Sequence, residues 1–300
     1  MSGPVTQNLI VRLAKYARVK LTRWSRPVLF RIWRWRSLRR FGQMRPIFYR
    51  GFRFWVMSAD WRGYWLATSR DVNPHTRVKV CALLDLKPEL FVDVGANYGE
   101  FVAEAVQRGI STIAVEANPD VVHCLRSTFG DCANVEILQE AATNKDGEAV
   151  LATLPGLTGF SSLTASLLSN KTGPGSVRAD LQLVRVRTRT LESMVGARPV
   201  VSLVIKVDVE GHEIDVIEGA IGLLSKVQDW WAILLEFDPV FLERRSLRAE
   251  EEFAKLIAVA PALGEYTDGR ITWRPALVSD CPARHTDILL GSEALLRHPS

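Results

Sequence analysis

The segment from Phe91 to Phe101, FVDVGANYGEF, constrains the fold of this chain most strongly. An apolar stretch ends around Asp93, and Gly95 and Gly99 follow before a helix-forming stretch begins. This order predicts a buried strand, a tight turn and a helix, the unit from which doubly wound α/β sheets are built. Glycine at both turn positions leaves bare backbone where a ligand can approach. We therefore expect a ligand-binding crevice at this turn.

Asn97 limits which ligand the turn can hold. A dinucleotide fingerprint, G-x-G-x-x-G, requires glycine at the position that Asn97 occupies. The turn therefore favours an adenosyl cofactor without a pyrophosphate and disfavours a nicotinamide oxidoreductase.

From about residue 75 onward, short apolar stretches alternate with helical ones, which predicts a parallel sheet. The expected strands are residues 90–94, 111–115, 135–138, 200–209, 232–237, 271–274 and 286–290, and the expected helices are 100–108, 119–129, 214–224 and 250–259. Residues 149–153 and 182–190 alternate like a pair of sheet-edge strands around a polar excursion, residues 157–176. Within it, Gly159 to Leu163 either closes over a substrate or forms a surface loop.

Polar residues follow four successive predicted strands, at the strand ends that border the ligand crevice of an open α/β sheet. They are Asp93, Gly95, Asn97 and Gly99 after the first strand, Glu116 and Asn118 after the second, Glu140 after the third, and Asp208 to Glu213 after the fourth. Glu116 stands where an acidic side chain accepts the two hydroxyls of a ribose. Structural alternatives remain: Asp93 as a helix cap, Glu116 as a solvated loop acid and Glu140 as an edge residue.

Five short stretches resemble, in order and spacing, the motifs of the FkbM-type S-adenosylmethionine-dependent methyltransferases. They are Asp93–Gly99 (DVGANYG), Val115–Pro119 (VEANP), Ile205–Glu213 (IKVDVEGHE), Gly219-Ala220 and Leu235-Glu236. The resemblance implies a class I, Rossmann-like α/β fold, with a seven-stranded, mostly parallel sheet and helices on both faces. It also implies O-methylation of a hydroxyl on a sugar, glycolipid or natural product.

The resemblance further assigns roles around S-adenosylmethionine. Asp93, Gly95, Asn97 and Gly99 would shape the pocket for its methionine part, Glu116 would hold the ribose hydroxyls, Asn118 would fix that loop, and Glu140 would border the adenine.

Methyl transfer to a hydroxyl requires that the acceptor oxygen be positioned against the methyl group and that a nearby residue take the hydroxyl proton. A sulfonium methyl is already activated, so in-line placement of the acceptor oxygen supplies most of the acceleration. A hydroxyl must also lose its proton, and Asp208, His212 and Glu236 are the candidate catalytic residues. We assign Asp208 to positioning and His212 to the base, because imidazole titrates near neutral pH; the alternative for His212 is a packing role at the next helix. No metal is expected, because no ligand spacing demands one, although Asp208, Glu210, His212 and Glu236 together could chelate a divalent ion.

The first 70 residues differ in charge from the rest of the chain. They contain 16 of the 38 Lys and Arg residues, one of the 33 acidic residues and six of the nine tryptophans. We therefore divide the chain into a basic, Trp-rich helical extension, residues 1–70, and a methyltransferase domain, residues 71–300.

Such an extension suits three partners. Arginines with interfacial aromatics are typical of segments on an anionic membrane surface. They also suit nucleic acid, or packing on the protein's own acidic domain or on a second subunit of a homo-oligomer. Nucleic acid is the weaker alternative, because no nucleic-acid motif accompanies the charge and no Asn/Asp-Pro-Pro-aromatic element follows the fourth strand. A cofactor-binding scaffold without turnover is the remaining rival.

Cysteine usage and hydropathy bear on location. The four cysteines form no C-x-x-C pair, and no apolar run reaches the ~18 residues of a membrane span. We expect a cytoplasmic protein, peripheral at the inner face of the membrane if the extension binds lipid.

Overall fold

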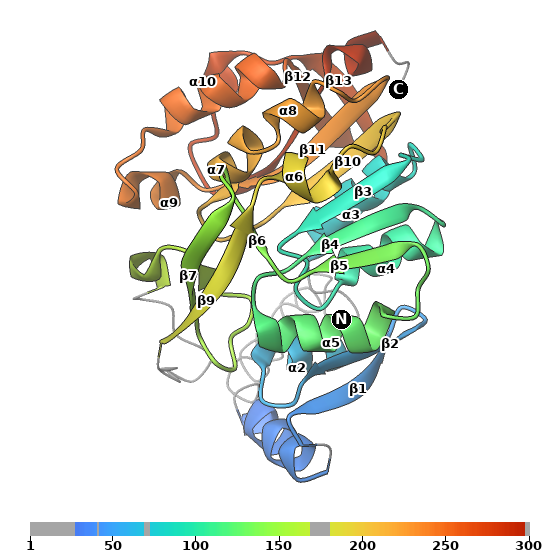
Figure 1. Ribbon diagram of the computed structural model, residues 1–300, viewed down its shortest axis with the longest axis vertical. Coiled ribbons are helices and arrows are strands. Elements are labelled where there is room, and N and C mark those ends of the chain that lie inside the picture. Colours follow the sequence, from blue (N-terminus) through green and yellow to red (C-terminus); the bar gives the residue numbers. More distant parts are fainter. Residues whose placement is uncertain (1–27, 41, 69–72, 169–180, 298–300) are drawn as a thin grey trace, which may run out of the picture.

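An eight-stranded sheet organises the computed structural model, which describes residues 28–40, 42–68, 73–168 and 181–297 (Figure 1). The strand order is β13-β12-β14-β11-β10-β3-β4-β5. The strands are β3 (Leu90–Val94), β4 (Ser111–Val115), β5 (Val135–Leu138), β10 (Ser202–Val207), β11 (Trp230–Phe237), β12 (Ala262–Thr267), β13 (Arg270–Pro275) and β14 (Thr286–Gly291). The five strands from β11 to β5 run parallel, whereas β14, β12 and β13 pair antiparallel. The predicted α/β fold with a mostly parallel core is confirmed.

The sheet has eight strands rather than the seven expected, because β12 was not predicted. Its sequence, ALGEYT, is mixed in polarity, and only its first two residues are buried. Gly264 within β12 packs so closely that an added Cβ would lie 2.9 Å from both Trp273 and Leu289. The strand is therefore recognised by tertiary packing rather than by a local pattern.

Helices cover both faces of the sheet. On one face lie α3 (Pro74–Leu84), α4 (Glu100–Gln107) and α5 (Pro119–Phe129), and on the other lie α6 (Leu191–Val195), α7 (Glu213–Glu218), α8 (Ile221–Leu224) and α10 (Ala249–Val259). Because side chains alternate along a strand, Val204 of β10 packs among α3 and α4, while Leu203 and Ile205 pack against the other layer. Both faces of the central strands are therefore buried.

The single helix predicted over residues 214–224 is divided into α7 and α8. Gly219 stands between them, and a Cβ at this position would lie 2.1 Å from the carbonyl oxygen of Thr143. The chain bends at Gly219, and this bend lets it approach the segment that follows β5.

A second sheet lies beside the first, in the order β6-β9-β7-β8, where β6 is the short strand Ala141–Ala142. Its long strands, β7 (Gly147–Thr153) and β9 (Gln182–Arg189), pair with each other as predicted. They run antiparallel and form a sheet of their own rather than an edge of the first (Figure 1). The excursion between them contains β8 (Ser161–Ser162) and the short helix η1 (Ala165–Leu168). Residues 169–180, which include the end of the excursion, lie outside the described residues.

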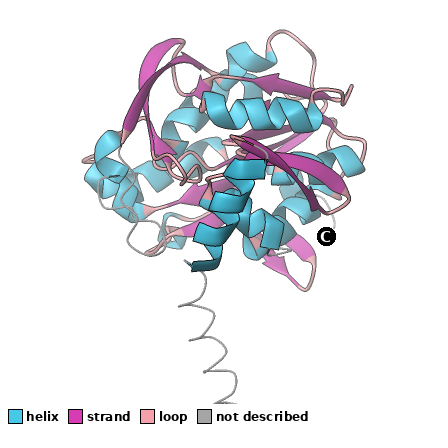
Figure 2. Ribbon diagram, turned by 90° about the horizontal axis from the view of Figure 1, so that it is seen from below, coloured by secondary structure: helices cyan, strands magenta, loops and turns pink. Residues whose placement is uncertain are grey.

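The N-terminal region contains strands as well as helices, which corrects the expected all-helical extension. Residues 28–40 are helical, β1 (Met44–Tyr49) and β2 (Phe52–Met57) form a hairpin, and α2 (Trp61–Thr68) follows (Figures 1 and 2). The hairpin turns at Arg50 and Gly51, whose φ angles of 48° and 84° are both positive, as in a type I′ turn. Residues 1–27, the first part of the predicted extension, lie outside the described residues.

The hairpin and the methyltransferase domain share one hydrophobic cluster. Phe54 and Phe129 of α5 meet edge to face, with ring centroids 5.6 Å apart, and the Trp55 amide donates to Thr128 Oγ1 at 2.9 Å. The hairpin therefore covers the outer side of α5, although the division at residue 70 stays a prediction. In the described part of the chain, no helix is long and apolar enough to cross a bilayer.

Candidate functional site

A cleft opens at the carboxyl ends of β3, β4 and β10. Its wall comes from these three strand ends, from the segment after β5, from α2 and from the excursion. The lining residues are Arg62, Gly95, Asn97, Glu116, Ala117, Ala141, Ala142, Leu151, Thr158, Gly159, Ser161, Ser162, Leu163, Asp208, Val209, Glu210 and His212. We call it the donor cleft. It brings together five of the predicted site residues: Gly95, Asn97, Glu116, Asp208 and His212.

Gly95 allows two strand ends to touch. Its φ is +73°, and an added Cβ would lie 1.9 Å from the carbonyl oxygen of Asp208. Its amide donates to the carbonyl of Val115 at 2.9 Å. Glycine is required here by conformation and by contact, and the backbone on the cleft side stays bare.

Asn97 fixes the turn from a left-handed conformation, with φ of 48°. Its Oδ1 accepts from the Tyr98 amide at 3.0 Å, and its Nδ2 donates to the carbonyl of Thr158 at 3.0 Å. The first bond is the local one that lets Asn tolerate this conformation, and the second joins the turn to the excursion. Asn97, the residue that breaks the dinucleotide pattern, therefore connects the turn after β3 to the excursion in the wall of the cleft.

Glu116 is held by backbone amides on both sides of its carboxylate. Oε2 accepts from the Asn97 amide at 2.9 Å, and Oε1 accepts from the Asn118 amide at 2.8 Å. Burial raises the pKa of Glu116, and these two hydrogen bonds oppose the rise. Each oxygen keeps further acceptor capacity, so a pair of neighbouring hydroxyls can bind here. This geometry fits the ribose of S-adenosylmethionine.

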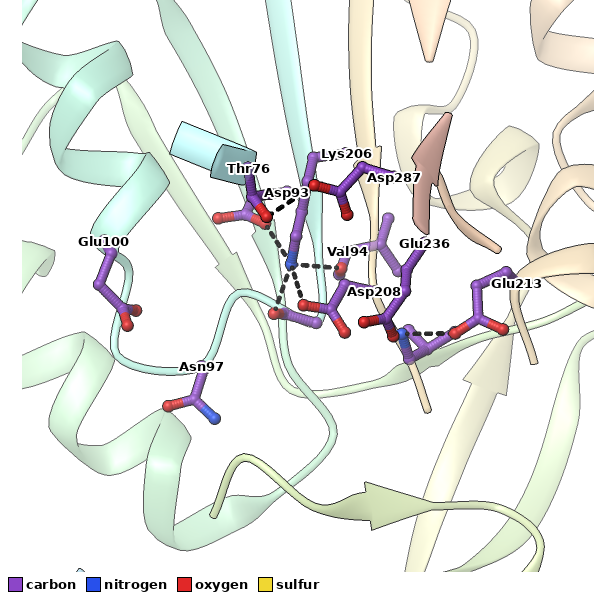
Figure 3. A network of polar contacts seen from close by, with 12 residues as sticks. Thr76, Asp93, Val94, Asn97, Glu100, Lys206, Asp208, Glu213, Glu236 and Asp287 are labelled. Atoms are coloured by element: carbon purple, nitrogen blue, oxygen red, sulfur yellow. Dashed lines mark hydrogen bonds and ion pairs between the residues drawn. The ribbon is translucent and has the colours of Figure 1, made fainter. Parts of the chain in front are cut away.

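Asp93 lies beneath the turn and does not line the donor cleft. It is fully buried, and it projects toward the face of the sheet that α3 and α4 cover. Burial raises the pKa of Asp93, and Lys206 opposes the rise from 3.4 Å (Figure 3). Neither carboxylate oxygen of Asp93 has a hydrogen-bond partner, so the ion pair with Lys206 is the contact that compensates its charge. Asp93 therefore shapes the pocket only through Lys206.

Lys206 is the residue that the sequence interpretation missed at the centre of the site. Its side chain is 2% exposed, and its Nζ lies 3.0 Å from the carbonyl of Gly95 and 3.5 Å from Asp208 Oδ2 (Figure 3). Burial lowers its pKa, but the nearby carboxylates more than offset this and leave the pKa raised. The signal was present in the sequence: a lysine stands inside the apolar run VVSLVIKVDV.

Three other predicted residues have structural partners outside the donor cleft. A Cβ at Gly99 would lie 2.5 Å from Phe129, so glycine permits close packing of α4 on α5. Asn118 caps α5 by accepting from the Asp120 amide. Glu140 pairs with Arg187 at 3.3 Å and Arg189 at 3.2 Å, and the adjacent alanines 141 and 142 line the cleft instead.

Two cations act on Asp208. Its side chain is 28% exposed, Lys206 Nζ lies 3.5 Å from its Oδ2, and Arg62 of α2 lines the same cleft. Burial would raise the pKa of Asp208, but Lys206 and Arg62 together hold it below its usual range. Asp208 is therefore ionised at neutral pH and remains partly open to the cleft.

Glu236, at the end of β11, has the opposite character. Burial raises its pKa to about 10, and the neighbouring Asp208 and Glu210 add to the shift. The protonated carboxyl donates a hydrogen bond to Asp208. A group that holds its proton at neutral pH cannot serve there as a base, which weighs against the base role that we considered for Glu236.

His212 is held at both ring nitrogens. Nδ1 lies 2.7 Å from Asp215 Oδ2, and Nε2 lies 2.9 Å from Thr164 Oγ1. Asp215 is itself paired with Arg245 at 2.7 Å. The ring thus connects α7 to the excursion, and this arrangement supports the packing alternative for His212.

Glu213 holds the loop between Asp208 and His212 in place. Its Oε1 accepts from the amides of Val209 at 3.1 Å and Gly211 at 3.0 Å. Burial raises the pKa of Glu213 to about 7. The first residue of α7 therefore shapes the wall that His212 and Glu210 line.

A second cleft adjoins the first and shares Arg62, Gly159, Asp208 and Glu210 with it. Its other lining residues are Trp61, Trp65, Asn73, Leu157, Phe160 and Glu236. We call it the aromatic cleft. The tryptophans and Arg62 come from α2, so the N-terminal region forms part of the site.

Two hydrogen bonds hold α2 and the excursion together. Buried Asp60 accepts from the Thr158 amide at 2.8 Å, and the Trp61 amide donates to the carbonyl of Gly156 at 2.9 Å. Arg62 is anchored in turn, because its Nε and Nη2 donate to Glu100 Oε1 at 2.9 and 2.8 Å. Sequence reasoning missed these residues because no local motif surrounds them.

Comparison with known proteins places this site in a family. The methyltransferase FkbM domain matches residues 93–265. No curated protein sequence matches the chain.

Within the described residues, no cluster of three or more His, Cys, Asp or Glu side chains is arranged to hold a metal ion.

Several solved structures are similar to the chain. A methyltransferase FkbM from Methylobacillus flagellatus KT has a TM-score of 0.39 and 15% identity, over 68% of this chain and 44% of that one. A SAM-dependent methyltransferase from Agrobacterium tumefaciens has a TM-score of 0.40 and 10% identity, over 85% and 71%. An O-methyltransferase from Bacillus cereus has a TM-score of 0.37 and 14% identity, over 74% and 82%. This chain thus spans less than half of the first of these proteins.

The family match covers more than half of the 300 residues, and it includes the turn after β3 and the strand ends at Glu116 and Asp208. The predicted family and cofactor are thereby confirmed: the chain belongs to the FkbM family of S-adenosylmethionine-dependent methyltransferases.

Proposed function

We propose that this methyltransferase transfers a methyl group to a hydroxyl of an acceptor bound in the aromatic cleft. The observation that supports this most is the shared wall of the two clefts. Asp208 and Arg62 line both, so a group in the donor cleft and a group in the aromatic cleft meet beside the Asp208 carboxylate. In-line placement of two reactants is what methyl transfer requires.

The donor cleft has the groups that S-adenosylmethionine needs. Glu116 would accept the ribose hydroxyls, while Gly95 and Asn97 would present backbone to the rest of the cofactor. Bound there, the cofactor supplies an activated methyl group on a sulfonium. Lys206 stabilises the turn from below by donating to the carbonyls of Gly95 and Val94.

Asp208 is the residue that we assign to the acceptor hydroxyl. Its ionised carboxylate would accept the hydroxyl hydrogen bond, orient the oxygen and take up the proton as that oxygen bonds to the methyl carbon, while the bond from that carbon to sulfur breaks and S-adenosylhomocysteine is left. Glu236, which donates to Asp208, orients this carboxylate. This assignment revises the sequence-based choice of His212 as the base, because His212 lines the donor cleft and is not among the residues of the aromatic cleft.

The aromatic cleft suits a neutral acceptor that has both apolar faces and hydroxyls. Trp61, Trp65 and Phe160 offer ring faces, and Asp208 and Glu210 offer acceptors for hydroxyl hydrogens. Two acidic side chains disfavour the closely spaced phosphates of nucleic acid. A sugar, a glycolipid or a hydroxylated natural product combines these properties.

The test is a search for the acceptor. Purified full-length protein is incubated with methyl-labelled S-adenosylmethionine and with glycan, glycolipid or RNA fractions. We expect label in a glycan or glycolipid product, stable to alkali as an ether is, together with stoichiometric S-adenosylhomocysteine. Label in RNA, or on nitrogen or carboxylate, would overturn the proposal.

A further inference from the structure

Helix 28–40 has two apolar faces that meet different surroundings. Its inner face packs on α2: the ring of Phe30 lies 5.0 Å from that of Trp61, and the ring of Trp33 lies 5.5 Å from that of Tyr64. Ser37, on the same side, is buried and accepts from Arg45 at 2.8 Å. These contacts fix the helix on the fold, at the end opposite to β12 and β13 (Figure 1).

The outer face of this helix forms an exposed apolar stripe. Val28, Leu29, Ile32, Trp35 and Leu38 are each between 39% and 58% exposed. Residues in a helix turn by about 100° per position, so these five lie along one side, opposite Phe30 and Ser37. Figure 2 views the fold from this end. A soluble surface seldom leaves so many large apolar side chains together.

Arginines share this outer face with the apolar side chains. By the same helical geometry, Arg31, Arg36 and Arg39 fall between the five apolar residues, Arg34 and Arg40 lie just beyond the two edges, and all five arginines are exposed. Arg39 lies over the ring of Trp35, with its guanidinium carbon 4.8 Å from the centroid. No acidic residue occurs in this segment. A face that combines large apolar side chains with arginines and carries no acidic residue matches an anionic lipid surface, whose acyl boundary takes the apolar side chains and whose headgroups take the arginines.

We propose that the outer face of helix 28–40 is a docking surface for an anionic membrane. A second copy is a poorer occupant, because two identical faces would bring the arginines of one copy against the arginines of the other. Nucleic acid is also poorer, since it stacks on aromatic rings and gains little from Val28, Leu29, Ile32 or Leu38.

The proposal has a consequence for the acceptor, and this part rests on the proposed function. Trp61 contacts Phe30 of the docking helix and also lines the aromatic cleft. Docking would therefore hold that cleft close to the headgroup layer, where a lipid-linked sugar is presented.

Vesicle binding of the full-length protein tests the docking surface without any methyl transfer. The probes are vesicles of phosphatidylcholine alone and of phosphatidylcholine with an equal part of phosphatidylglycerol. The test variant is I32E/W35E. Its matched control is L277E/V278E, which places the same charges on two side chains that are 58% and 53% exposed at the other end of the fold.

We expect wild type and the control to bind the anionic vesicles, more weakly as salt is raised, and I32E/W35E to bind more than about tenfold more weakly. Circular dichroism should show all three folded. Equal binding by I32E/W35E and wild type would overturn the proposal. So would a wild type that ignores anionic vesicles, that forms dimers through this stripe, or that binds RNA instead.

Methyl transfer by I32E/W35E separates the two proposals. Transfer to a water-soluble acceptor should be unchanged, while transfer to the same headgroup in vesicles should fall. If no hydroxyl acceptor is methylated by any variant, the proposed function fails while the vesicle result still stands.

Discussion

The ammonium group of Lys206 lies 3.5 Å from a carboxylate oxygen of Asp208, inside the sheet and directly below the glycine turn. Lys206 also lies 3.4 Å from Asp93, so one buried cation serves a structural carboxylate and a carboxylate of the site. This relationship links the stability of the fold to the ionisation of Asp208.

Replacing Lys206 with Met should therefore destabilise the protein, by about 3–5 kcal/mol, because it leaves Asp93 buried without its counter-ion. The pKa of Asp208 should rise as well, since Lys206 holds it down. The double variant D93N/K206M should recover part of the lost stability, because it removes both members of the pair. Urea unfolding measures the effect; equal losses in the single and double variants would contradict it.

Changing Glu236 to Gln should preserve activity, because glutamine resembles the protonated carboxyl. We expect kcat/KM to stay within about tenfold of wild type, well short of the 10²–10⁴ loss for a removed base. A larger loss at neutral pH, with S-adenosylmethionine affinity unchanged, would show that Glu236 acts as a base.

The raised pKa of Glu236 also predicts that the stability of E236Q relative to wild type depends on pH. Folding raises the pKa of Glu236 to about 10. The stability that protonated Glu236 contributes is therefore fully present below its pKa in the unfolded chain, about 4.3. This contribution is lost as the pH rises toward the pKa in the folded protein. The free energy of unfolding of E236Q should thus increase relative to wild type as pH rises. A difference that is constant between about pH 5 and pH 9 would contradict this.

Gly95→Ala should damage both folding and cofactor binding, because the new Cβ would lie 1.9 Å from a backbone oxygen of Asp208. Gly109 is a matched control: its φ is +70°, and nothing lies within 4 Å of an added Cβ. We expect G109A to cost about 1–2 kcal/mol from backbone strain alone and G95A to cost more. Thermal unfolding and titration with S-adenosylmethionine would show this. Similar losses in the two variants would refute the close-contact role.

Thr164→Val and His212→Asn test whether His212 has a structural role, as the hydrogen-bonded connection between α7 and the excursion. Each removes the contact between Nε2 and Oγ1, so each should weaken S-adenosylmethionine binding by a similar, modest factor of about five. The double variant should add little, because both changes break the same contact. If H212N alone lowered kcat by 10² or more while T164V did not, His212 would be the base after all.

The residues predicted most accurately are those whose signal is local. Strands β3, β4 and β5 and helix α5 have the predicted limits, since glycines, caps and continuous apolar runs mark them in the sequence. Glu116 and Asp208 lie at the cleft because parallel strands end at the same edge of the sheet.

Other parts of the site depend on tertiary packing. Arg62 and Trp65 reach the clefts only because the β1–β2 hairpin packs on α5 and α2 is tied to the excursion through Asp60. Asp93 and Glu140 stand at the predicted strand ends, yet each is turned to a basic partner that the sequence pattern could not place. A strand-end position thus predicts where a backbone lies more securely than where its side chain points.

Asp208→Asn tests the central claim most directly, with methyl transfer and S-adenosylmethionine affinity measured on the same protein. We predict a fall in kcat of about 10²–10⁴ with the cofactor dissociation constant nearly unchanged, because Asp208 acts on the acceptor hydroxyl. An unchanged kcat in D208N, with the protein folded and the cofactor bound, would contradict the account.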